Sequence, residues 1–183
     1  MKLPPDQLFE QTYVRPREGR TLIVGSKIFG QREDRRLRYR DAVGVDMQAG
    51  DGVDVVVDLE DEDEISFADL GPFAHIECLS VLEHSRRPWL LAENMQRLLE
   101  PGGTIFLSVP FVWRFHGYPN DYFRFTAEGV RALFPLIRWE QLQYASDRLR
   151  PDHYLPGLEK AAGNSGHPHL PRCEVMGFGA RAA

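Results

Sequence analysis

The stretch Phe73–Phe111, FAHIECLSVLEHSRRPWLLAENMQRLLEPGGTIFLSVPF, contains the pattern of a strand, a helix and a second strand. The runs at 73–80 and 103–111 are largely apolar throughout, which is typical of strands covered on both faces, as in parallel sheets. Between them, a proline opens a segment at 88–100 with apolar residues at helical spacing, and a Pro-Gly-Gly turn ends it. This stretch therefore predicts the strand–helix alternation of an α/β sheet.

The same alternation extends in both directions along the chain. We expect strands at 21–26, 42–47, 53–59, 136–145 and 173–182 and a helix at 126–134 with Thr126 as its N-cap. The pattern predicts an α/β fold: a doubly wound, mostly parallel sheet with helices on both faces and a C-terminal antiparallel strand. A segment rich in proline, glycine and histidine, 151–172, is expected to be an irregular loop. We expect one domain over residues 1–183.

Composition narrows the class of protein. Of the 183 residues, 43% are hydrophobic and 27% are charged, as in ordinary globular domains. The net charge of -5 argues against general nucleic-acid binding. The two cysteines form no C-x-x-C pair, and no apolar stretch is long enough for a signal or a membrane span. We expect a cytoplasmic protein with neither membrane nor nucleic acid as a partner.

Ligands of doubly wound sheets bind outside the carboxyl ends of the strands. The first strand ends in TLIVGSKIFG, Thr21–Gly30, whose glycines match neither the dinucleotide fingerprint nor a P-loop. An NAD-dependent dehydrogenase is therefore a weak interpretation. The second and third strands end in acidic residues, Asp46 and Asp58.

Two segments resemble the class I S-adenosylmethionine-dependent methyltransferases. The first is the SVLEH turn at 80–84 followed by the LEPGG turn at 99–103. The second is WRFHGYPNDYFRFTAEG, 113–129, which is similar to a segment in a subset of small-molecule enzymes. The resemblance covers roughly residues 20–146. It implies a Rossmann-like domain with S-adenosylmethionine as cofactor, acting on a sugar or natural-product acceptor by O- or N-methylation.

The resemblance also implies where the cofactor binds. The loop after the first strand would face its methionine part, the acids would bind ribose and adenine, and the end of the fourth strand would lie near the methyl group. The implied residues are Gly25, Ser26 and Lys27 for methionine, Asp46 for ribose, Met47, Asp58 and Leu59 for adenine, and Leu79 and Ser80 for the methyl group. Because the family's G-x-G-x-G pattern is reduced to Gly25, Lys27 could pair with the cofactor carboxylate, or it could simply face solvent.

The segment 113–126 is expected to form the acceptor wall, because aromatic side chains with a few polar groups are typical of ligand pockets. The candidate substrate-binding residues are Trp113, Arg114, Tyr118, Asp121, Tyr122 and Arg124. His116 and His84 are the candidate bases for a hydroxyl acceptor, and each could instead have a structural role. We expect no metal, since Ser80 replaces the first carboxylate of the E-x-x-E-H pattern found in some methyltransferases. Only two local ligands then remain, Glu83 and His84, with His116 as a remote third.

The alternative function is a non-catalytic, degenerate methyltransferase-like domain that serves as a scaffold or partner subunit. The irregular glycine loop favours it, whereas Asp46, Asp58 and the SVLEH turn oppose it. We expect no large lid on the pocket, which would be open or closed by a second copy or a partner protein.

Three charged features have simpler interpretations. The mixed-charge run 31–40 favours a solvated helix face, and the acidic run 58–64 a solvated loop in which only Asp58 is functional. His75 and Glu77 lie at i and i+2 of one strand, on the same face, and we expect them to share a hydrogen bond.

Overall fold

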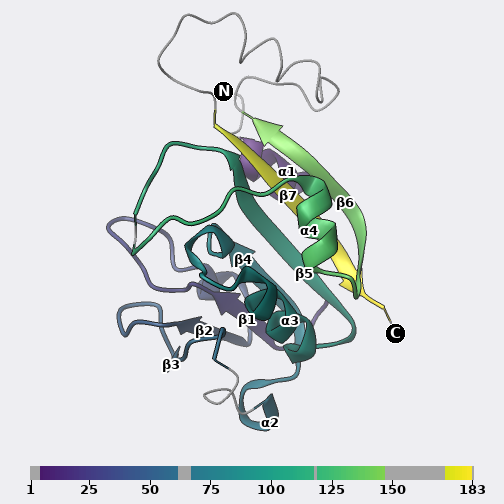
Figure 1. Ribbon diagram of the computed structural model, residues 1–183. Coiled ribbons are helices and arrows are strands. Elements are labelled where there is room, and N and C mark those ends of the chain that lie inside the picture. Colours follow the sequence, from purple (N-terminus) through teal and green to yellow (C-terminus); the bar gives the residue numbers. More distant parts are fainter. Residues whose placement is uncertain (1–4, 62–66, 118, 147–171, 183) are drawn as a thin grey trace, which may run out of the picture.

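The sheet has seven strands within the described part of the chain: β1 Thr21–Val24, β2 Ala42–Asp46, β3 Val55–Val56, β4 Phe73–Leu79, β5 Leu99–Val112, β6 Ile137–Ser146 and β7 Cys173–Arg181. The computed structural model describes residues 5–61, 67–117, 119–146 and 172–182 (Figure 1). The strand order is β3-β2-β1-β4-β5-β7-β6, with parallel pairing from β3 to β5. β7 is antiparallel to both β5 and β6, which confirms the expected fold class.

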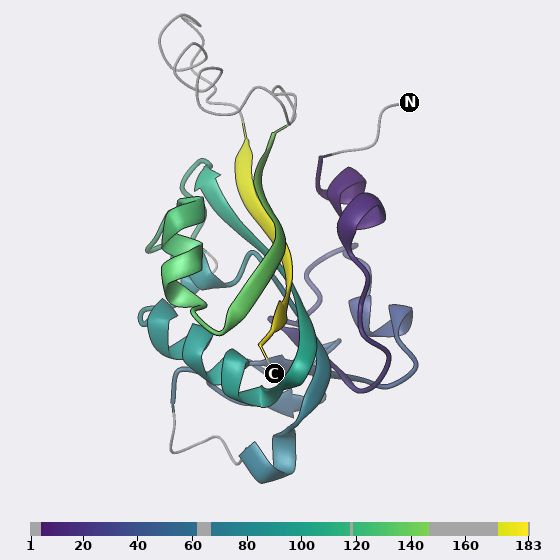
Figure 2. The ribbon, with the colours of Figure 1, turned by 90° about the vertical axis from the view of Figure 1, so that its right-hand side faces the viewer.

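Helices lie on both faces of the sheet. The α-helices are α1 Pro5–Tyr13, α2 Phe67–Leu70, α3 Pro88–Leu98 and α4 Ala127–Leu133, and the 3-10 helices are η1 Arg35–Arg38 and η2 Leu82–His84. Figure 2 shows α3 and α4 on one side of the sheet and α1 and η1 on the other. In the described residues, no helix combines the length and the apolar character that crossing a bilayer requires.

Each face of the sheet has its own core. The larger core lies under α3 and α4, where Met95 and Phe134 are buried together with Ile76 of β4. The smaller core packs α1 onto the sheet, and the ring of Phe9 stacks on that of Phe106 with 6.0 Å between centroids. The sequence pattern did not predict α1, whose mixed composition gives only a short apolar stripe.

The charged run 31–40 is not a solvated helix face. It forms only the short η1, and Arg35 points inward, where its Nε contacts the buried carboxylate of Glu77 and its Nη2 donates to Glu10 over 2.7 Å. The Tyr39 hydroxyl donates to the other oxygen of Glu77 over 2.5 Å. The expectation was wrong because a mixed-charge pattern looks the same whether its partners are water or a buried acid.

His75 and Glu77 do not share the expected hydrogen bond. Glu77 accepts hydrogen bonds from the η1 segment, whereas Nδ1 of His75 lies 2.9 Å from the Thr104 hydroxyl and 3.1 Å from its carbonyl oxygen. Burial lowers the pKa of His75 to about 4, so the imidazole is neutral at physiological pH. Each side chain thus has a partner on a neighbouring element, which the spacing within one strand could not indicate.

Candidate functional site

A cavity of about 650 Å³ opens at the carboxyl ends of the parallel strands. It lies where β1, β2, β4 and β5 end, the edge at which doubly wound sheets bind ligands. Most of the residues predicted to bind the cofactor line it: Gly25, Lys27, Asp46, Met47, Asp58, Leu59, Leu79 and Ser80. Ser26 does not line it, and its Oγ is buried without a hydrogen-bond partner among the described residues.

Asp46 lines this cavity and links the loops after β1 and β2 by hydrogen bonds. One carboxylate oxygen accepts the Lys27 N–H over 3.3 Å, and the other accepts the Gln48 N–H over 2.9 Å. A carboxylate has about four acceptor sites. The two that remain can accept from the hydroxyls of a ligand in the cavity.

Lys27 extends toward the end of β2. Its Nζ donates to the Gln48 side chain over 3.0 Å, and its alkyl chain covers Gly50. The amine also lies 5.4 Å from the centroid of the Phe29 ring. The structure therefore gives Lys27 a protein partner, and its pairing with a ligand carboxylate stays a prediction.

Gly25 is required by the protein's own packing. Its φ is +69°, and a Cβ at this position would lie 2.5 Å from Cγ2 of Val81, in the turn after β4. Glycine lets the loop after β1 approach this turn, on the wall of the cavity. Ser80 next to Val81 also has a positive φ, 56°, which is uncommon for a residue with a side chain.

We expect Gly25→Ala to lower the free energy of unfolding by about 2–4 kcal/mol, as a sum of left-handed strain and overpacking. Gly30→Ala is the matched control, because Gly30 has a φ of +64° and open space around it. It should cost only the strain, about 1–2 kcal/mol. Urea unfolding measures both, and equal losses would show that the contact with Val81 is unimportant.

The segment after β5 is hydrogen-bonded to η2 and to the residues beside it. The backbone N–H groups of Tyr122 and Phe123 donate to the Glu83 carbonyl over 2.8 and 3.3 Å, and Nδ1 of His84 contacts the Asn120 carbonyl. These bonds bring Trp113 and His116 to the cavity, which both of them line.

The other predicted substrate residues have different surroundings. The side chain of Asp121 is 1% exposed and pairs with Arg124, which lowers the pKa of the Asp121 carboxyl to about 2. Arg124 also donates to the carbonyls of Trp113 and Arg114, so this pair fixes the shape of the segment. Neither member lines the cavity, nor do Arg114 and Tyr122. Tyr118 lies outside the described residues.

Glu83 is the site residue whose surroundings the sequence did not indicate. Its side chain is 1% exposed, and its Oε1 lies 3.7 Å from Nε2 of His84 and 3.8 Å from Nε2 of His116. Burial raises the pKa of Glu83 to about 8. The SVLEH turn marks Glu83 and His84, but no sequence signal places His116 beside them.

Further polar groups of the cavity come from loops and from β7. Glu60 accepts the N–H groups of Arg86 and Arg87, each over 3.1 Å, so part of the acidic run 58–64 is not simply solvated. Arg172 pairs with Glu174, and its guanidinium lies 4.4 Å from the centroid of the Trp113 ring. The remaining residues of the expected loop 151–172 lie outside the described residues.

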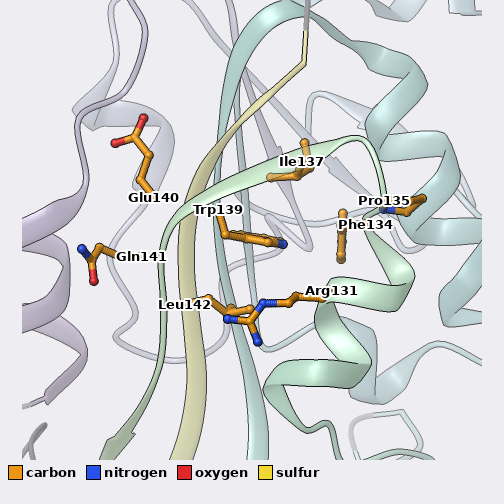
Figure 3. A pocket seen from close by; sticks show the side chains of 8 residues that line it. All are labelled: Arg131, Phe134, Pro135, Ile137, Trp139, Glu140, Gln141 and Leu142. Carbon is orange, nitrogen blue, oxygen red and sulfur yellow. The ribbon is translucent and has the colours of Figure 1, made fainter.

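A second cavity, of about 500 Å³, lies between α4 and β6 (Figure 3). The indole of Trp139 stands in it among Arg131, Phe134 and Ile137, and its Nε1 has no hydrogen-bond partner among the described residues. None of the predicted site residues lines this cavity. The cleft at the strand ends is therefore the candidate site.

No protein-family model matches the chain, and no curated protein matches it. Solved structures do. A chain of the complex between the Haloferax volcanii Trm112 methyltransferase activator and a methyltransferase matches with a TM-score of 0.56 and 15% identity, over 97% of this chain and 94% of that one. The [4+2]-cyclase SpnF matches with a TM-score of 0.62 and 14% identity, over 97% of this chain and 79% of that one.

Phosphoethanolamine N-methyltransferase 2 of Haemonchus contortus, solved with phosphomonomethylethanolamine and S-adenosylhomocysteine, matches with a TM-score of 0.61 and 11% identity. This chain is covered to 98%, but it spans only 53% of that enzyme. The chain therefore has the class I methyltransferase fold. Since a cyclase is among the proteins of similar structure, this fold by itself does not establish methyl transfer.

Proposed function

We propose that the protein binds S-adenosylmethionine in the cleft at the strand ends and transfers its methyl group to a small molecule. The observation that supports this most strongly is Asp46, whose carboxylate lines the cleft with acceptor capacity left after two backbone hydrogen bonds. When bound, the cofactor would supply an activated methyl group, so the protein's contribution is chiefly to position the acceptor.

The residues that line the cleft fit the parts of this cofactor. Asp46 would accept hydrogen bonds from the ribose hydroxyls, with the exposed Met47 against the adenine and Asp58 near its amino group. Gly25 and Lys27 would border the methionine part, and Leu79 and Ser80 would lie near the methyl group. The solved Haemonchus contortus enzyme, which has the same fold, holds S-adenosylhomocysteine.

The acceptor would bind on the side of His84, His116 and Trp113, which line the same cavity. Nδ1 of each histidine lies next to a backbone carbonyl, which leaves Nε2 to face a ligand or take a proton from a hydroxyl. We propose a sugar or natural-product acceptor with a hydroxyl or an amine at the methylated position.

A non-catalytic scaffold is the alternative, and one observation favours it. Lys27 stands in the loop where the family has glycines, and its amine already donates a hydrogen bond to the Gln48 side chain. Thermal unfolding with and without S-adenosylhomocysteine separates the two functions. At about 100 times its dissociation constant, a ligand of the native state stabilises by about 2.7 kcal/mol, which raises the melting temperature by roughly 5–10 °C. No shift at millimolar ligand would contradict the proposed cofactor.

A further inference from the structure

Three side chains from two separate segments meet at the acceptor side of the cleft. Glu83 and His84 belong to η2, and His116 comes from the segment after β5. Their ligand atoms all lie within 4.8 Å of one another. We call Glu83, His84 and His116 the histidine–glutamate cluster.

No hydrogen bond joins the members of this cluster. Oε1 of Glu83 is 3.7 and 3.8 Å from the two Nε2 atoms, beyond the range of a hydrogen bond. Two ligand atoms that share a metal ion, each about 2.1 Å from it, lie ~3.6 Å apart at an angle of ~120°. The two distances from Oε1 thus suit an ion between Glu83 and each histidine.

The surroundings of the cluster hold the two rings in the tautomer that metal ligands need. Nδ1 of His84 contacts the Asn120 carbonyl, and Nδ1 of His116 lies 3.1 Å from the Arg114 carbonyl. A backbone carbonyl can only accept, so each Nδ1 carries the proton and each Nε2 offers a lone pair. Metal-binding histidines almost always donate their second ring N–H in this way.

Glu83 supplies a second, independent sign of a missing partner. Its side chain is 1% exposed, and its Oε2 is buried without a hydrogen-bond partner among the described residues. Burying a polar atom without a hydrogen-bond partner is destabilising, so an exception in a native protein needs an explanation, and a bound ion is one.

We propose that the histidine–glutamate cluster binds a divalent transition-metal ion. Two imidazoles and one carboxylate favour Zn²⁺, Fe²⁺ or Co²⁺ over Mg²⁺, which prefers oxygen ligands and keeps several waters. Three protein ligands leave coordination positions open toward the cavity, which all three residues line. The sequence alone argued against a metal, because only Glu83 and His84 are adjacent along the chain and His116 is remote from them.

The metal site also narrows the acceptor class, in an inference that rests on the proposed function. An ion at this position would bind an oxygen of the acceptor and lower the pKa of a coordinated hydroxyl. The acceptor would then be a molecule with a hydroxyl, methylated on oxygen, and the two histidines would act as ligands rather than as bases.

The test is a titration of the full-length, metal-stripped protein with Co²⁺, followed by visible absorption and by calorimetry, with Zn²⁺ as competitor. We expect one ion per chain, displaced by Zn²⁺, and no binding of Mg²⁺ at the same concentrations. His116→Asn and Glu83→Gln should each weaken Co²⁺ binding by about 100-fold or more, since even outer-shell partners contribute 10–100-fold.

Two controls make the result specific. Glu60→Gln changes another carboxylate that lines the cavity and should leave Co²⁺ affinity unchanged. The triple variant His153→Asn/His167→Asn/His169→Asn removes the histidines that lie outside the described residues, and it should also bind normally. Circular dichroism checks that each variant folds. If Glu83→Gln does not fold, the Co²⁺ affinity of folded His116→Asn decides the question.

Three results would overturn the proposed metal site. They are the absence of Co²⁺ and Zn²⁺ binding to the wild-type protein, unchanged affinity in folded His116→Asn, and loss of binding in the triple variant. S-adenosylhomocysteine binding to the metal-stripped protein is measured in parallel. Its absence would contradict the proposed function and leave the metal result standing, so the two failures are distinguishable.

Discussion

Replacement of Arg35 by methionine is expected to lower the free energy of unfolding by about 3–5 kcal/mol, the usual cost of breaking a buried ion pair from one side. Glu77 of β4 is 1% exposed, and Arg35 is the cation in contact with it. Methionine keeps the length of the side chain but removes the charge. The carboxylate then keeps the Tyr39 hydroxyl as a partner, which cannot neutralise it.

Two further variants test this explanation by urea unfolding. Arg35→Met combined with Glu77→Leu should recover most of the loss, because replacing both partners of a buried pair by apolar groups is often neutral. Arg38→Met is the control: Arg38 pairs with Glu33, whose side chain is 57% exposed, and with Glu10, which it shares with Arg35, but it does not contact Glu77. Pairs that are open to solvent contribute about 0–1 kcal/mol, so its loss should be much smaller. If the double variant were as unstable as the single one, the loss would arise from packing and not from the buried charge.

This ion pair explains an unusual feature of the fold. Between β1 and β2, where a doubly wound sheet would carry a helix, the described chain forms only η1, which has no buried residues. Arg35 and Tyr39 fix the segment to the sheet through Glu77, and the same segment continues into the loop with Gly25 and Lys27. The ion pair therefore anchors one wall of the candidate cofactor site.

The sheet was predictable because buried parallel strands are continuous apolar runs bounded by turn residues. The runs at 73–80 and 103–111 correspond to β4 and β5, although β5 begins earlier, at Leu99, where α3 has just ended. Of the strand expected at 53–59, only Val55–Val56 pair, as β3, and both residues are exposed at the sheet edge. Apolar composition indicates a strand but does not fix how far its pairing extends.

The residues that meet on the cofactor side of the site could be predicted from the sheet topology, whereas those on the acceptor side could not. Parallel strands end at one edge, so Gly25, Asp46 and Ser80 had to come together. The approach of His116 to Glu83 depends on backbone hydrogen bonds from Tyr122 and Phe123 to the Glu83 carbonyl. Backbone groups have no residue-specific signal, and for this reason the sequence could name His116 only as a remote third ligand and could not place it beside Glu83 and His84.

Asp46→Ala is expected to weaken S-adenosylhomocysteine binding by about 1.5–3 kcal/mol, roughly 10- to 150-fold, which is the range for hydrogen bonds to a charged group. The reason is that the carboxylate at the end of β2 still has acceptor sites for a vicinal diol. Isothermal titration calorimetry measures the change. Asp51→Ala is the control, because Asp51 is an exposed carboxylate nearby that does not line the cavity.

A loss of affinity in Asp46→Ala has a second explanation, because the substitution also removes the hydrogen bonds to the Lys27 and Gln48 N–H groups and could loosen both loops. An analogue of S-adenosylhomocysteine that lacks one ribose hydroxyl separates the two. If Asp46 binds the ribose, the wild-type protein should discriminate against the analogue, and Asp46→Ala should lose most of that discrimination, as coupled partners do in a double-mutant cycle. If both proteins discriminated equally, Asp46 would only shape the loops, and the ribose would have to bind elsewhere in the cleft.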